Sequence, residues 1–133
     1  MNSRIGLGLL SLVFGCFALS AANAQFGSEP SKLDLIKIQN DVYVIHNAYV
    51  PGNVTALITN EGVILVDDKF EIDHDNIVAM LKTVTNQPIK YVINTHYHGD
   101  HSGGNAKLQA GGTLAVASAQ ARARMVAGKQ SGL

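Results

Sequence analysis

The sequence of 133 residues is long enough for one modest domain. Ten basic and ten acidic residues give a formal net charge of +0, so no charge excess favours nucleic acid or an anionic membrane surface as a partner. With Cys16 as the only cysteine, the chain can form neither an internal disulfide nor a cluster of thiolate metal ligands.

The N-terminal residues predict an export signal rather than part of a fold. A basic residue precedes an almost uninterrupted apolar run from Ile5 to Ala21, and Ala22-Asn23-Ala24 forms a small-x-small cleavage site before Gln25. We expect residues 1–24 to be a signal peptide whose removal leaves no stable membrane anchor, so that the protein is periplasmic or secreted. Two alternatives stay open, a retained membrane anchor and lipoprotein processing at Cys16.

Short strands are expected in the next part of the chain. Residues 25–40 comprise a polar lead and the first strand, and the lead itself, residues 25–33, is expected to be a flexible arm. Apolar runs between turn residues predict strands at 35–38, 42–45, 54–59 and 63–67, which form two hairpins. Val63–Val66 has no polar alternation, which is typical of a strand buried on both faces.

Helices and strands alternate in the rest of the chain. Glu71–Thr85 is expected to be the clearest helix, with acidic residues in its first turn and an apolar stripe formed by Ile77, Met80, Leu81 and Val84. After it we expect a buried strand at 89–94, a short helix capped by Ser102 and running through Leu108, a strand at 113–117, and a helix capped by Ser118 and ending near Gly128. This order predicts an α/β fold.

The stretch from His96 to His101 carries the strongest chemical signal. It reads His-Tyr-His-Gly-Asp-His and holds three of the five histidines of the chain. Imidazole and carboxylate are ligands that zinc takes in catalytic sites. The pattern predicts a metal site, and a histidine-rich surface turn is disfavoured by the ligand spacing and by the Gly103-Gly104 exit.

This motif with its flanks, Thr95–Asn105, resembles the His-x-His-x-Asp-His signature of the metallo-β-lactamase superfamily of hydrolases. Asn53–Asp67 resembles the opening hairpin of that family, and the similarity spans about residues 41–127. One departure is visible, because Asp67-Asp68-Lys69-Phe70 stands where the family usually has a glycine soon after the first aspartate. The resemblance implies that residues 41–133 are the N-terminal half of an αββα metallo-β-lactamase sandwich, truncated at the C-terminus.

The resemblance also implies the ligands. His96 and His98 are expected to bind a first zinc ion, and Asp100 and His101 a second one, with iron as the alternative metal. Asp100 is in addition the expected catalytic residue, because its carboxylate can orient the attacking water in the manner of a general base.

Three further polar residues receive expectations of their own. Asp67, at the end of a strand, is expected either to hold a ligand histidine by a hydrogen bond or to cap the following turn. His46 and His74 match no position of the family motif and are expected not to bind metal.

The implied function is an exported zinc-dependent hydrolase in which a metal-activated hydroxide attacks a small-molecule lactam, lactone, ester or thioester. The motif is shared by β-lactamases, lactonases, thioesterases, esterases and sulfatases, so it does not choose the substrate. After His101 the sequence has no histidine, aspartate or glutamate, whereas the resemblance implies further ligands from a second half. We expect these ligands beyond Leu133, in a longer chain, and the alternative is a truncated metal-binding fragment without catalytic activity.

Overall fold

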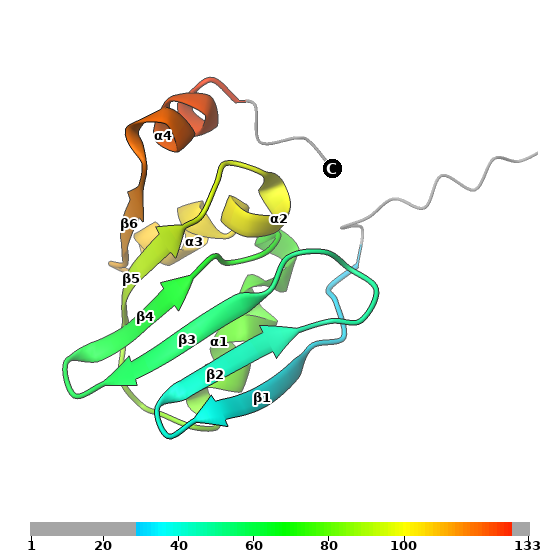
Figure 1. Cartoon of the computed structure of the whole chain (residues 1–133), viewed down its shortest axis with the longest axis vertical. Coiled ribbons are helices and arrows are strands. Elements are labelled where there is room, and N and C mark those ends of the chain that lie inside the picture. Colours follow the sequence, from blue (N-terminus) through cyan, green and yellow to red (C-terminus); the bar gives the residue numbers. More distant parts are fainter. Residues whose placement is uncertain (1–28, 129–133) are drawn as a thin grey trace, which may run out of the picture.

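The computed structural model of the protein describes residues 29–128 (Figure 1). The predicted signal peptide therefore lies outside the described residues. The elements in chain order are β1 (Asp34–Gln39), β2 (Val42–His46), β3 (Val54–Thr59), β4 (Gly62–Val66), a 3-10 turn η1 (Glu71–Asp73), α1 (His74–Lys82), β5 (Ile89–Asn94), α2 (Gly99–Ser102), α3 (Asn105–Ala110), β6 (Leu114–Ala117) and α4 (Ala119–Val126). The fold is α/β, as the sequence predicts.

Six strands form one sheet in the order in which they occur in the sequence. The strands β1 to β4 pair antiparallel, whereas β4, β5 and β6 run parallel to one another. Parallel neighbours need a crossover connection, and α1 provides it between β4 and β5, while α2 and α3 provide it between β5 and β6. Figure 1 shows α1 and α3 behind the sheet, on one of its two faces.

The hydrophobic core lies between that face and the two helices. Alternate residues of the strands point to it, because successive side chains of a strand project to opposite faces. The buried core residues from the strands and helices are Ile45, Val54, Ala56, Val63, Leu65, Ile77, Leu81, Val92 and Leu108, together with Leu33 before β1.

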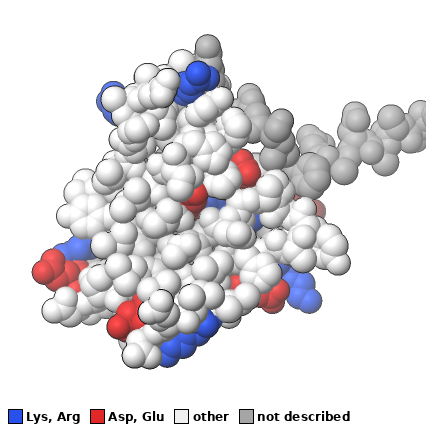
Figure 2. Space-filling model, viewed as in Figure 1, with Lys and Arg blue, Asp and Glu red and all other residues white. Residues whose placement is uncertain are grey.

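The opposite face of the sheet is apolar, and no element of residues 29–128 covers it. The strand pairing aligns two rows of side chains across this open face: Ile36, Val44, Thr55, Val66, Ile93 and Val116 in one, and Val42, Leu57, Ile64, Tyr91 and Leu114 in the other. Leu114 is 61% exposed and Val116 46%. Figure 2, viewed from this side, is largely white over the strands, with most charged side chains near the margins.

The predicted strands are all present, but the first helix differs from its prediction. The α-helix begins at His74 after the 3-10 turn and ends at Lys82, before Val84. Its apolar stripe is otherwise correct, because Ile77 and Leu81 are buried. The end comes early because the Thr83 hydroxyl donates to the carbonyl of Met80 at 2.6 Å and competes with continued helical bonding.

The prediction of a helix that is capped by Ser102 and runs through Leu108 is wrong about where the helix begins. Ser102 is the last residue of α2, and its Oγ donates back to the carbonyls of Tyr97 at 3.1 Å and His98 at 3.0 Å. A separate helix, α3, then begins at Asn105. The cap of the final helix is confirmed, because Ser118 Oγ accepts from the backbone of Ala121 at 3.1 Å.

The flexible arm predicted for residues 25–33 is also wrong for its last residues. Ser31 donates to the buried carboxylate of Asp73 through its backbone N–H at 2.6 Å and its hydroxyl at 3.2 Å, and Leu33 enters the core. A buried carboxylate needs donors, and this segment supplies them.

Among the described residues, every helix is too short or too polar to cross a bilayer.

Candidate metal centre

The predicted metal-binding residues lie at one edge of the sheet, where β4 and β5 end side by side. Val66 pairs with Ile93, so the residues that follow the two strands come together above this edge. In open sheets with parallel strands, the carboxyl ends of the strands are where loops form binding sites. Asp67 follows β4 here, and Thr95 follows β5.

Asp67 organises this edge through its carboxylate. Oδ1 accepts from the backbone of Thr95 at 2.7 Å, and Oδ2 accepts from the Thr95 hydroxyl at 2.8 Å and lies 2.7 Å from His101 Nδ1. Because a carboxylate can only accept, His101 donates its Nδ1 proton in this hydrogen bond. Of the two roles predicted for Asp67, the structure shows the hydrogen bond to a motif histidine.

Three of the four predicted ligands converge. One ligand atom from each of His96, Asp100 and His101 lies within 4.8 Å of the others. His101 Nε2 is 3.2 Å from Asp100 Oδ2, and the rings of His96 and His101 are centred 4.1 Å apart. Two imidazoles and one carboxylate are a donor set that suits zinc and also iron, so the residues present fit the metal that the motif predicts.

His98 lies beside this cluster. Its ring is centred 4.8 Å from that of His96 and 4.5 Å from that of Tyr97. The geometry groups His96 with Asp100 and His101, and the pairing of His96 with His98 on one ion stays a prediction. His46 and His74 lie outside the cluster, at the end of β2 and at the start of α1.

The turn that departs from the family pattern is built without glycine. Asp67 and Lys69 have φ angles of 62° and 58°, in the left-handed region that residues other than glycine rarely adopt. Backbone hydrogen bonds hold the turn, from Asp68 N to the His101 carbonyl at 3.1 Å and from Gly103 N to the Lys69 carbonyl at 2.9 Å. A β-carbon at Gly103 would lie 2.9 Å from that carbonyl, so the motif packs on the turn only with glycine there.

Sequence reasoning missed two residues near this centre. Thr95 Oγ1 lies between Asp67 Oδ2 and His96 Nδ1, at 2.8 and 3.0 Å, and so connects a carboxylate to a candidate ligand. Lys69 is completely buried at the turn. The signal that could have found it is a lysine placed directly after a buried strand and two aspartates.

Asp68 is another buried carboxylate, next to Asp67. It is 1% exposed, and its Oδ1 accepts from the backbone of Gly104 at 3.0 Å. Burial raises the pKa of Asp68 to about 7, the Gly104 hydrogen bond opposes this shift, and the charge of Asp67 adds to it.

A family model agrees with this geometry over most of the chain. The model is described as the metallo-beta-lactamase superfamily, and it matches residues 48–132. The chain belongs to the metallo-β-lactamase superfamily. The match includes the metal-site motif, the turn after β4 and the four C-terminal elements, so the superfamily relation covers the whole candidate centre.

Solved metallo-β-lactamases share the fold. A metallo-β-lactamase from Cronobacter sakazakii, a mutant in its HARLDQ motif, has 26% sequence identity and a TM-score of 0.64, over 71% of this chain and 38% of that chain. FIM-1 from Pseudomonas aeruginosa, in its mono-zinc form, has 23% identity and a TM-score of 0.66, over 76% of this chain and 48% of that chain. The chain thus spans less than half the length of these metallo-β-lactamases.

Some hollows of the described residues adjoin the metallo-β-lactamase motif and one lies away from it. One of about 330 Å³ adjoins the centre between the motif and α4, and it is lined by Thr95, His96, Tyr97, Ser118, Gln120, Ala121 and Arg124. The Arg124 guanidinium lies 4.9 Å from the centre of the Tyr97 ring, which is a cation–π distance and ties α4 to the motif.

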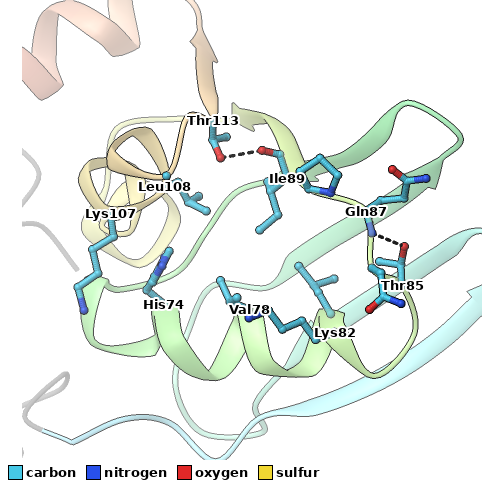
Figure 3. Close-up of a pocket in the computed structure, with 13 residues that line it drawn as sticks. His74, Val78, Lys82, Thr85, Gln87, Ile89, Lys107, Leu108 and Thr113 are labelled. Carbon is cyan, nitrogen blue, oxygen red and sulfur yellow. Dashed lines mark hydrogen bonds between the residues drawn. The ribbon is translucent and has the colours of Figure 1, made fainter.

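Another hollow, of about 410 Å³, lies between α1, α3 and the start of β5. In Figure 3, Val78 and Leu108 give it an apolar interior, and Thr113 donates to the carbonyl of Ile89 at 2.9 Å at one side. Neither Asp100 nor His101 lines it, so it is separate from the candidate centre.

Proposed function

We propose that the protein is an exported, zinc-dependent hydrolase of the metallo-β-lactamase superfamily that acts on a small-molecule lactam, lactone, ester or thioester. The observation that carries this proposal is the convergence of His96, Asp100 and His101 within 4.8 Å, with His101 held by Asp67. Iron is the alternative metal, because it accepts the same ligand types.

The four candidate ligands would be His96, His98, Asp100 and His101. Asp67 orients His101 by accepting a hydrogen bond from Nδ1–H, so that the other ring nitrogen, Nε2, faces Asp100. Hydrogen bonds of this kind fix the tautomer and the ring orientation of metal-binding histidines. When bound, zinc lowers the pKa of its water from about 15.7 toward 7 and polarises the substrate carbonyl.

Asp100 is the proposed catalytic residue. Asp100 is 6% exposed, and its carboxylate lies 3.2 Å from His101 Nε2, within the candidate metal cluster. From there an Asp100 carboxylate oxygen can accept a hydrogen bond from the attacking water and orient it.

The metal proposal is tested by elemental analysis of the purified protein. We expect about two divalent ions per chain in the whole protein. The variant His98→Ala should lose most of the tightly held metal. The variant Asp100→Asn should lose mainly the second ion and turnover, while the first ion stays bound. A wild-type protein with no metal above background would contradict the proposal. Equal loss of both ions in Asp100→Asn would contradict the specific role of Asp100.

The export proposal rests on residues 1–24 and has a separate test. Expressed in a bacterium, the mature chain should begin at Gln25 and should be found in the periplasm. A lipidated N-terminus at Cys16, or a chain that still begins at Met1, would contradict it.

A second candidate is a metal-binding protein without hydrolytic activity. It is favoured by one observation, that ligand atoms of three described residues converge, which is too few for the two ions that the resemblance implies, because a catalytic zinc usually has three protein ligands. A panel of nitrocefin and nitrophenyl esters, assayed with and without a chelator, separates the candidates. Chelator-sensitive turnover above that of free zinc supports the hydrolase.

A further inference from the structure

Lys69 is a lysine with no exposed surface, placed immediately beside the candidate centre. Its ammonium donates to three consecutive backbone carbonyls, those of Val50 at 3.3 Å, Pro51 at 2.9 Å and Gly52 at 2.7 Å. An ammonium has three protons to donate, so the three carbonyls match its full capacity. They belong to the loop between β2 and β3, residues 47–53, which is called the β2–β3 loop below.

A lysine in this place needs strong compensation. Lysine is almost never fully buried without partners, because removing its charge from water is costly. Burial lowers the pKa of Lys69, and the carboxylates of Asp73 and Asp100 oppose that shift. The charge of Lys69 therefore acts on one of the candidate ligands as well as on the loop.

The β2–β3 loop is shaped at both of its ends. At its start, Asn47 Oδ1 accepts from the backbone N–H groups of Tyr49 at 2.7 Å and Val50 at 2.8 Å. At its other end, the Lys69 ammonium holds the carbonyls. Between them Tyr49 is 89% exposed, so the order of the loop comes from these two polar attachments rather than from a buried side chain at its tip.

The loop touches the candidate ligand that is the proposed catalytic residue. Gly52, with φ of 80°, comes so close to Asp100 that an added β-carbon would lie 2.0 Å from the Asp100 carbonyl oxygen. On its other side, the Lys69 backbone carbonyl accepts from Gly103 N, just after α2. Lys69 thus connects the β2–β3 loop, through its ammonium, to Gly103 after the motif, through its backbone carbonyl.

We propose that Lys69 is a positioning residue that clamps the β2–β3 loop against Asp100 and thereby fixes the Asp100 carboxylate for metal binding. The proposal rests on the proposed metal-dependent function, because it assigns Lys69 a role at that same site. The clamp consists of one cation and three carbonyls, and it acts through the backbone of Gly52.

The direction in which zinc affinity changes in Lys69→Met separates a positioning role of Lys69 from a purely electrostatic one. A cation near a metal ligand repels a bound metal ion, so a Lys69 that acted only through its charge would weaken zinc binding, and the neutral Lys69→Met would bind zinc more tightly. A positioning residue predicts the reverse. Removing a group that orients a ligand typically lowers metal affinity by about 10- to 100-fold.

The experiment measures zinc affinity by competition with a chromophoric chelator in wild type, Lys69→Met and Lys37→Met. Lys37 is an exposed lysine of β1, far along the sheet from the motif, and it controls for the loss of one positive charge. We expect at least about tenfold weaker zinc binding in Lys69→Met and an unchanged affinity in Lys37→Met. Equal or tighter zinc binding in Lys69→Met would overturn the proposal.

Chemical rescue distinguishes the clamp from a general loss of folding. Lys69→Ala leaves a cavity lined by the three carbonyls, and added methylammonium should restore zinc affinity there, whereas tetramethylammonium, which has no N–H group, should not. Restoration by neither cation, or by both, would overturn the clamp.

A metal-independent measurement keeps this proposal distinct from the proposed function. In metal-free protein, cleavage by chymotrypsin after Tyr49 should be faster in Lys69→Met than in wild type, since the loop is then released. If wild type binds no zinc, the proposed function fails, and unchanged cleavage in Lys69→Met overturns the clamp separately.

Discussion

Two adjacent aspartates show how strongly position decides the chemistry of a residue. Asp67 receives two hydrogen bonds from Thr95 and one from His101, so its carboxylate is well satisfied. Asp68 points to the other side, where burial raises its pKa to about 7. Of these two identical neighbours, Asp67 is therefore an oriented hydrogen-bond acceptor at the candidate centre, whereas the buried Asp68 favours its protonated form.

The raised pKa of Asp68 predicts a pH-dependent stability. Between pH 3.8 and about 7 the unfolded chain has released a proton that the folded protein retains, so the free energy of unfolding falls as the pH rises through this window. In metal-free protein, Asp68→Asn should thus be as stable as wild type near pH 4 and more stable at pH 8. The gain is on the order of 4 kcal/mol at about 1.4 kcal/mol for each pH unit.

Thermal or urea unfolding at several pH values in the presence of a chelator measures this difference. Asp34→Asn, at an exposed position of β1, is the matched control and should show no such increase between pH 4 and pH 8. A stability difference between Asp68→Asn and wild type that does not vary with pH would contradict the assignment.

At the scale of elements, the β2–β3 loop depends on a close backbone approach. Gly52 and Gly112 both have positive φ angles, 80° and 94°, but only Gly52 has atoms within reach of an added β-carbon. Alanine at either position should cost about 1–2 kcal/mol because of the left-handed backbone. Gly52→Ala must in addition displace the loop from Asp100.

We therefore expect Gly112→Ala to lower the stability alone, and Gly52→Ala to lower both the stability and the zinc affinity. Unfolding midpoints and chelator competition, measured on the same two proteins, test this. Zinc affinities that fall equally in the two variants would argue against a link between the loop and the metal site.

The elements also show which features a sequence can reveal. The strands were predictable because their apolar runs are separated by turn residues such as Asn60-Glu61-Gly62, and the metal motif was predictable because its ligands are contiguous. The early end of α1 was not, because it depends on the hydroxyl of Thr83. The role of Lys69 was not predictable either, because its partners at Val50 to Gly52 come together with it only in the folded sheet.

At the scale of the molecule, the open face of the sheet is an apolar surface that no element of the described residues covers. Its two rows of side chains combine Ile36, Leu57, Tyr91, Ile93, Leu114 and Val116, each at least 40% exposed. A continuous exposed apolar surface of this kind usually marks a place where another protein surface packs. The solved metallo-β-lactamases are longer than this chain, which covers 38% and 48% of their lengths, so they have additional chain available for this.

This surface predicts the behaviour of residues 25–133 expressed alone. We expect this polypeptide to associate and to unfold without a sharp transition, and to hydrolyse neither nitrocefin nor nitrophenyl esters faster than free zinc. Size-exclusion chromatography should show less association for Ile93→Lys, on the open face, than for Ala79→Lys, an exposed position of α1. Cooperative unfolding with chelator-sensitive turnover would contradict the prediction.

The order of the strands has a consequence for how the protein is made. Each strand pairs with the one before it in the sequence, from β1 to β6, so every new strand can dock on an edge that already exists. The antiparallel pairs from β1 to β4 close short loops, which favours rapid folding, whereas the parallel pairs of β5 and β6 need longer crossover connections. The motif His96–His101 follows β5, so it would be synthesised after the first five strands. Asp67, which orients His101, would therefore leave the ribosome before the motif histidines.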